Sequence, residues 1–174
     1  MRSRKRRVLV VVAVAELLAM SLWFSATAVA PELAADWGLS PAERTWLTNA
    51  VQLGFVAGAL LSSIFTLSDV IRPRYLFAGS AVAGAACTAL IAGVVTSALP
   101  AVALRFLTGV ALAGVYPPGI KILAGWFERG RGRAIGVLIG ALTVGSALPH
   151  LLRAVGGVGD PRLVLYGAAL LATV

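Results

Sequence analysis

The chain has 174 residues, of which 59% are apolar and only 13% are charged, and its formal net charge is +8. A soluble domain carries roughly 25% charged residues, so this composition argues against one. The excess of Lys and Arg lies in short clusters between long apolar stretches, which argues against a nucleic-acid-binding protein. We therefore predict an all-α membrane protein with the lipid bilayer, and no nucleic acid, as its surroundings.

Six apolar stretches predict a bundle of six transmembrane helices. About 20 helical residues are needed to cross ~30 Å of hydrocarbon, and each of the first five stretches is that long. The sixth is shorter, so we expect an incomplete last helix in a piece of a longer protein; an interfacial or re-entrant helix is the alternative. We expect a single N-terminal transmembrane bundle over 1–174, with spans at about 8–30, 42–67, 75–97, 100–124, 134–155 and 161–174.

The connecting segments are short and alternate in character. The segment 31–44 is predicted to be an acidic loop, in which Ser40, Pro41 and Glu43 have the spacing of a helix N-cap, a first-turn proline and a capping-box partner. The next connection on that side joins the third and fourth spans almost directly, and 156–161 is predicted to be a short turn. On the other side lie 68–74 and the basic loop 126–133.

The basic residues predict the orientation of the chain in the membrane. Eleven of the fifteen fall on one side if the spans alternate in direction: before the first span, at 72–74 and at 121–133. This positive-inside pattern places the N-terminus in the cytoplasm of a multi-pass protein of the cell (inner) membrane. The same residues are expected to contact anionic lipid.

Polar side chains inside the apolar stretches are the candidates for a functional site. A charge in a membrane segment costs roughly 2.5–3.5 kcal/mol on insertion scales, so such a residue usually faces a cavity or a partner. The candidates for substrate or ion coupling are Arg105, Glu16, Trp23, Thr27, Asn49, Gln52 and His150.

Each of these residues also has a purely structural interpretation. Arg105 can snorkel to the nearer interface, and Glu16 can be a neutral, packed side chain. Asn49 and Gln52 can join helices by hydrogen bonds, while Trp23 and His150 can simply pack.

Glycines at a spacing of four predict faces where helices approach closely. They are Gly54 and Gly58 on the second span, and Gly136 and Gly140 on the fifth. Two interpretations remain open: packing within this bundle, or docking of a second one.

No enzyme, metal or cofactor is expected. Ser146 and His150 are four residues apart on one helix, but they lack a third group to orient the histidine and the oxyanion donors that a nucleophile needs. The chain contains neither a phosphate-binding loop nor a cluster of metal ligands.

Three motifs add a family resemblance over nearly the whole chain. Residues 65–74, FTLSDVIRPR, share the Asp and the last basic residue of the pattern G-x-x-x-D-[RK]-x-G-[RK]-[RK]. Residues 105–113, RFLTGVALA, fit the pattern R-x-x-q-G-x-x-x-a except at the Gln. The segments 113–119 (AGVYPPG) and 125–127 (GWF) precede a basic loop. Together they resemble the N-terminal half of a major facilitator superfamily transporter.

The resemblance implies half of a twelve-helix secondary transporter that moves a small-molecule solute by alternating access, with the C-terminal six-helix half missing. It implies that helices one and four line the solute site, and that the loop with Asp69 and Arg74 forms part of an inner gate. Asp69 can instead pair locally with Arg72 or Arg74. Arg105 suits an anion or an acidic metabolite, and a coupling proton remains open. A passive channel or membrane scaffold protein is the alternative function.

Overall fold

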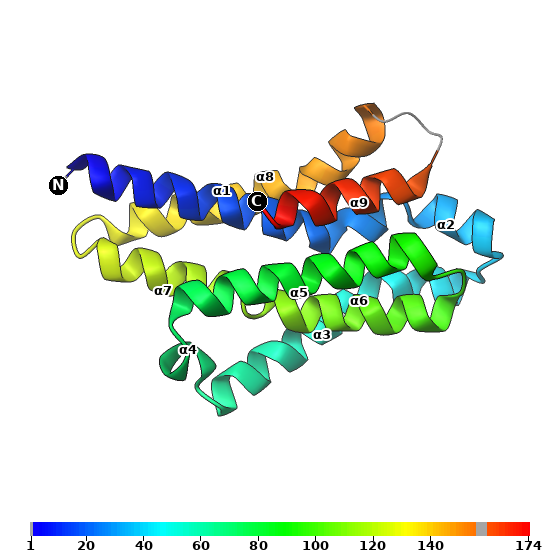
Figure 1. Cartoon of the computed structure of the whole chain (residues 1–174), viewed down its shortest axis with the longest axis horizontal. Helices are drawn as coiled ribbons and strands as arrows, with labels where there is room; N and C mark the ends of the chain where they lie inside the picture. Colours follow the sequence, from blue (N-terminus) through cyan, green and yellow to red (C-terminus); the bar gives the residue numbers. More distant parts are fainter. Residues whose placement is uncertain (1, 156–159) are drawn as a thin grey trace.

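The computed structural model describes residues 2–155 and 160–174 as a bundle of α-helices that run along one long axis (Figure 1). Most of the predicted turn at 156–161 lies outside the described residues. In chain order the helices are α1 (Arg2–Ala28), α2 (Ala30–Trp37), α3 (Pro41–Ile64), α4 (Leu67–Val70), α5 (Pro73–Val94), α6 (Ala98–Leu112), α7 (Tyr116–Trp126), α8 (Arg131–Val155) and α9 (Pro161–Ala172).

The predicted class, an all-α membrane bundle with a short last helix, is confirmed. Within the described ranges, five helical segments are long and apolar enough to cross a membrane, and the shorter apolar helix α9 follows them. The five segments are Ser3–Ala28, Pro41–Ile64, Pro73–Val94, Ala98–Trp126 and Arg131–Val155.

The predicted loop at 31–44 is wrong in its first half, because α2 occupies Ala30–Trp37. The chain breaks between α1 and α2, where Pro31 has no N–H to donate to the carbonyl four residues earlier. α2 ends at Trp37 and is capped by Gly38, whose φ of +64° is the left-handed conformation typical of the residue after a helix and whose N–H donates to Ala34 O.

The predicted start of α3 is confirmed in detail. The Ser40 side chain accepts a hydrogen bond from the backbone N–H of Glu43 at 3.3 Å. The Glu43 carboxylate in turn accepts from the backbone N–H of Ser40 at 2.8 Å. Pro41 occupies the first helical position, where its missing N–H would have no helical partner.

The fourth predicted span, 100–124, falls within one membrane-crossing segment, Ala98–Trp126, which consists of two helices. α6 ends at Leu112 and α7 begins at Tyr116, with a buried turn between them. Pro117 and Pro118 explain the break, because neither can donate the helical hydrogen bond that would otherwise reach back four residues. The predicted loop at 68–74 is also partly helical, since α4 ends at Val70.

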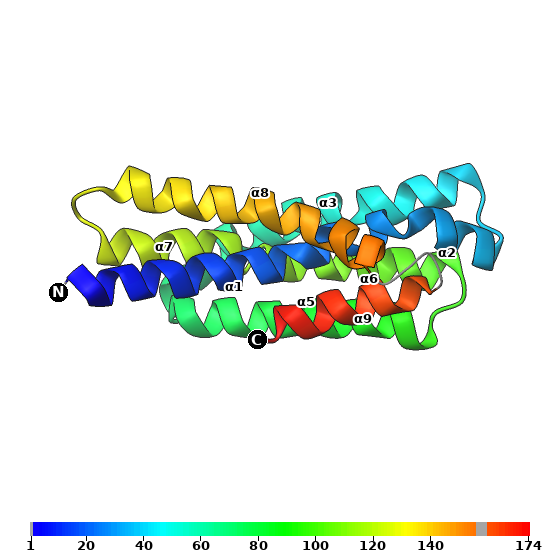
Figure 2. The ribbon, with the colours of Figure 1, turned by 90° about the horizontal axis from the view of Figure 1, so that it is seen from above.

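Two pairs of helices make especially close contacts. A Cβ atom built on Gly54 of α3 would overlap the carbonyl oxygen of Phe106 in α6, and one built on Gly109 of α6 would overlap that of Val51. In the second pair, Gly145 of α8 lies against the backbone of α1. In Figure 2, α8 lies along one side of the bundle, while α5 and α9 lie side by side on the opposite side.

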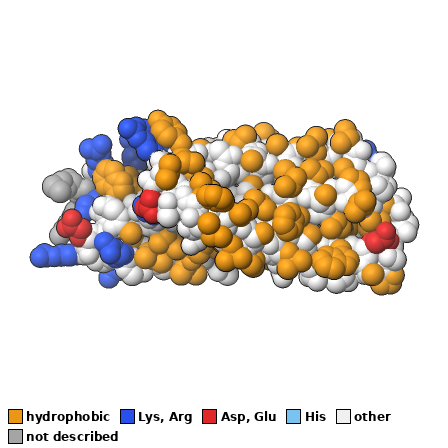
Figure 3. Space-filling view, turned by 90° about the horizontal axis from the view of Figure 1, so that it is seen from below, with side chains coloured by type: hydrophobic (Ala, Val, Ile, Leu, Met, Phe, Trp, Pro, Cys, Tyr) orange, Lys and Arg blue, Asp and Glu red, His pale blue; other side chains and the backbone are white. Residues whose placement is uncertain are grey.

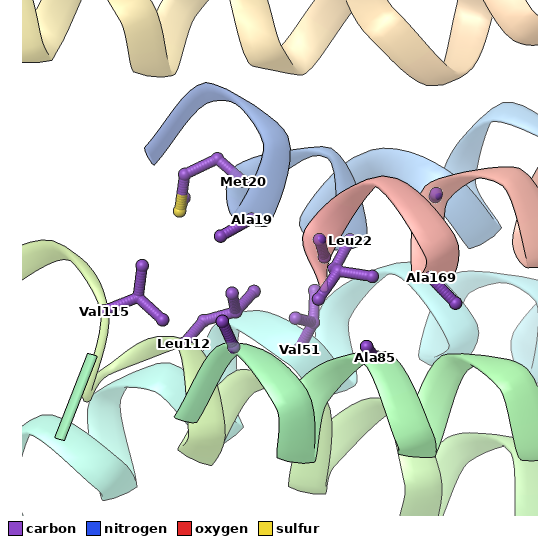
Figure 4. Packing of buried hydrophobic residues seen from close by; sticks show 11 residues of the cluster. Ala19, Met20, Leu22, Val51, Ala85, Leu112, Val115 and Ala169 are labelled. Carbon is purple, nitrogen blue, oxygen red and sulfur yellow. The ribbon is translucent and has the colours of Figure 1, made fainter. Parts of the chain in front are cut away.

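The largest cluster of buried hydrophobic residues lies where α1 packs against α3, α5, α6 and α9. Figure 4 shows Leu22 of α1 close to Val51 of α3 and Ala85 of α5, with Ala169 of α9 beside them. Leu22 is fully buried, so this cluster holds α3, α5 and α9 against α1.

Charge is distributed unevenly between the two ends of the bundle. Lys and Arg gather at the end that holds the N-terminus and the turn between α7 and α8, which we call the basic end (Figure 3). Between the two ends, much of the surface seen in this view is hydrophobic. At the basic end, Arg4 lies over the ring of Trp126 and Lys5 over that of Phe127, at 5.5 Å and 5.9 Å from the ring centroids. The first turns of α1 thus pack on the end of α7.

Candidate functional site

Arg105 is fully buried in α6, and its guanidinium joins three helices. Its Nε donates a hydrogen bond to Leu47 O of α3 at 3.2 Å. Its terminal nitrogens donate to Leu22 O at 2.9 Å and to Trp23 O at 2.5 Å, both in α1. A guanidinium carries five N–H donors, so each terminal nitrogen keeps one more N–H than these bonds use. Arg105 therefore joins α1, α3 and α6, and its side chain does not extend toward the membrane–water interface.

Trp23 and Thr27 are half-buried on α1. The Trp23 ring meets Phe55 of α3 edge to face, with centroids 5.1 Å apart and planes inclined by 62°. Trp23 therefore combines a packing contact through its ring with a hydrogen bond from Arg105 to its backbone.

The predicted polar face of α3 is exposed near the end opposite the basic end. Asn49 and Gln52 are both exposed, and Asn49 lines an open groove of about 560 Å³. His150 is exposed on α8 and takes part in none of the contacts of Arg105. The residues that line the groove with Asn49 are Ala34, Leu39, Pro41, Arg44, Thr45 and Thr48.

Glu16 is fully buried in α1, and neither carboxylate oxygen has a hydrogen-bond partner within the described residues. Its Oε2 lies against Gly119 of α7, where an added Cβ atom would be 3.0 Å away. Phe77 of α5 and Leu138 of α8 line the same position. We call Gly119, Phe77 and Leu138 the Glu16 cage.

Glu16 and Arg105 occupy different levels of the bundle. Arg105 binds α1 at Leu22, six residues from Glu16, which is about 9 Å of helix rise. One buried ionisable group thus has three hydrogen bonds and the other has none.

At the basic end, Asp69 of α4 pairs with Lys121 of α7. The distance between Lys121 Nζ and Asp69 Oδ1 is 2.5 Å. Arg74 instead lies over the ring of Tyr75, 4.6 Å from its centroid, and donates to the Tyr75 hydroxyl at 3.0 Å. Among the residues described, Asp69 makes no ion pair with Arg72 or Arg74, so the alternative of local pairing is wrong.

A second ion pair joins the ends of helices far apart in the sequence. Arg153 of α8 donates to the carboxylate of Glu32 in α2 and, at 3.1 Å, to Ala28 O at the end of α1. Neither this pair nor the partner of Asp69 was predicted from the sequence. The only available signal was that each pair has opposite charges on the same predicted side of the membrane.

The sequence was also compared with known proteins. The family model described as the Major Facilitator Superfamily matches residues 12–174, which include every site residue named above. A search of curated proteins and a search of solved structures each found no match. Since the matched segment takes in nearly all of the chain, the protein belongs to the Major Facilitator Superfamily of membrane transporters.

Proposed function

We propose that this bundle is one half of a secondary active transporter, which moves a small solute across the cell membrane by alternating access. A second six-helix bundle would rock against it around a site near the middle of the membrane. Family membership supports this proposal. The basic end is the cytoplasmic end in this proposal, because it carries most of the Lys and Arg residues.

The mechanism we propose depends on the burial of Glu16 without a hydrogen-bond partner among the described residues. We propose that the Glu16 carboxyl group binds and releases the proton that is coupled to transport. A buried carboxylate without a hydrogen-bond donor is far more costly than the neutral acid. In the enclosed state seen here, the side chain would therefore hold a proton. In a state that opens the Glu16 cage to water, the proton would leave, and its binding would be linked to the conformational change.

The solute we propose is a small anion or an acidic metabolite. Arg105 supports this choice, because its charge and the N–H groups beyond the three bound to backbone carbonyls suit a carboxylate or phosphate group. Trp23, Thr27, Asn49 and Gln52 are the further candidates for solute contacts.

Replacing Glu16 by Gln tests the proposal, since the amide cannot release a proton. We would place the transporter in liposomes with a pH-sensitive dye inside, and apply a panel of di- and tricarboxylates outside. The wild type should show proton movement that follows the solute, and Glu16→Gln should reduce it to background. Glu128→Gln is the matched control, because Glu128 is exposed in the turn between α7 and α8.

The two parts of the proposal fail in different ways. Proton movement that persists in Glu16→Gln would remove Glu16 from coupling. A wild type that responds to none of the carboxylates would remove carboxylates of this size as the solute.

The Asp69–Lys121 pair should also affect transport, because it holds α4 against α7. We expect Asp69→Lys to slow solute uptake by placing two positive charges together, and the double variant Asp69→Lys/Lys121→Asp to restore much of it. Uptake at matched membrane abundance measures both effects. Equal uptake by the single variant and the wild type would mean that the pair has no part in gating.

A further inference from the structure

Gly119 leaves a defined space beside the Glu16 carboxyl group. A Cβ atom at this position would lie 3.0 Å from Glu16 Oε2, 3.5 Å from Phe77 Cε2 and 3.7 Å from Leu138 Cδ2. The flexible carboxyl end is the only close neighbour, so a small side chain fits after a shift of a few tenths of an ångström. Tight packing alone therefore does not require glycine here.

Gly119 also offers no hydrogen-bond donor to the Glu16 carboxyl group. The backbone N–H of Gly119 is already used, because it donates to Val115 O at 3.0 Å. The other two walls of the cage, Phe77 and Leu138, have hydrocarbon side chains without polar atoms. A residue with a hydroxyl at position 119 would be the nearest donor that α7 could offer to Glu16 Oε2.

Ionisable groups on the helices around Glu16 do not supply a partner either. Lys121 of α7 is bound to Asp69, and Arg105 of α6 to backbone carbonyls. No hydrogen bond or ion pair joins Glu16 to any of them in the described part of the chain. The ionisable residues on the helices packed against α1 are Glu32 and Asp36 on α2, Glu43 and Arg44 on α3, Arg74, Tyr75 and Cys87 on α5, Arg105 on α6, Tyr116 and Lys121 on α7, Arg131, Arg133, His150 and Arg153 on α8, and Arg162 and Tyr166 on α9.

We infer that Gly119 is a positioning residue that withholds a donor from Glu16 and thereby sets the pH range in which this carboxyl group exchanges its proton. The inference rests on the proposed coupling role of Glu16. A donor at position 119 would bond the carboxylate more strongly than the neutral acid, because hydrogen bonds to charged groups are the stronger ones. The proton would then be released at lower pH.

The test is an infrared titration of the purified transporter in liposomes, with protons as the only ligand. The carbonyl band of a protonated carboxylic acid that disappears in Glu16→Gln reports the proton on Glu16. Gly119→Ser should move the midpoint of its titration down by about one pH unit, which corresponds to the advantage of a charged over a neutral hydrogen bond. Gly119→Ala should not lower it, because a methyl group adds bulk without a donor.

Two further variants keep the inference testable. Gly125→Ser is the control, because it lies on the same helix with nothing within 4 Å of the added Cβ atom. If Gly119→Ser does not fold, Phe77→Tyr adds a hydroxyl to the ring whose Cε2 lies 3.5 Å from the Cβ position of residue 119, and it should lower the midpoint.

The outcomes separate the inference from the proposed function. An unchanged midpoint in folded Gly119→Ser, or an equal downward shift in Gly119→Ala, would overturn the role of Gly119 even where Glu16→Gln abolishes coupled proton movement. A transporter whose coupling survives Glu16→Gln fails the proposed function instead, whatever the titration gives.

Discussion

Arg105→Lys lowers transport about tenfold, which is the expected result of losing one hydrogen bond from a charged donor. The ammonium group of lysine is a single point and cannot reach three carbonyl oxygens on two other helices as the planar guanidinium does. Arg105→Ala removes all three bonds and should also lower the free energy of unfolding by about 2 kcal/mol, at the average worth of a hydrogen bond between membrane helices.

Initial uptake and thermal unfolding of both variants, at matched surface expression, separate the two roles of this residue. Arg129→Lys is the control, because Arg129 is exposed in the turn between α7 and α8. Normal uptake by Arg105→Lys would remove the requirement for the planar fork. Normal uptake by Arg105→Ala would remove Arg105 from the mechanism altogether.

Gly54→Val and Gly109→Val should each destabilise the bundle strongly. At both positions the added Cβ atom would overlap a backbone carbonyl oxygen of the partner helix, and backbone atoms cannot move aside as a flexible side chain can. Forcing extra volume into such a contact costs up to about 3 kcal/mol, because α3 and α6 must separate. We expect little protein in the membrane and a lower unfolding temperature.

Gly79→Val is the matched control, since Gly79 lies in the span α5 with nothing within 4 Å of the added Cβ atom. If Gly54→Val accumulated and unfolded like Gly79→Val, the close contact between α3 and α6 would not exist. Gly136 and Gly140 also have open space beside them, so their face remains available for the proposed second bundle.

The apolar stretches predicted the helices well, because hydrophobicity over about 20 residues depends little on tertiary contacts. The breaks were harder to predict. Pro117 and Pro118 were visible in the sequence, but a proline in a membrane helix can bend it or interrupt it, depending on what replaces the lost bond. The capping residues Ser40 and Glu43 were predictable because both of their bonds are local.

The candidate site was predicted as a set of residues and not as an arrangement. The apolar stretches placed Glu16 and Arg105 inside the membrane, but they could not tell that one is enclosed by apolar groups while the other binds carbonyls. That difference depends on the rotation of α6 and α7 about their axes, and for α6 the close contact of Gly109 with Val51 of α3 limits that rotation. Lys121 and Arg153 were missed as partners because each pair joins helices far apart in the sequence.

The contact of Gly145 with α1 also has a consequence for synthesis of the chain. The residue it touches is Leu17, which leaves the ribosome 128 residues earlier, or roughly 6 to 26 seconds at ordinary elongation rates. During that interval α1 has entered the membrane without the helix that covers it, and Glu16 has no completed cage. Because α8 also supplies Leu138 to the Glu16 cage, we expect nascent chains that stop before α8 to be degraded faster than chains that include it.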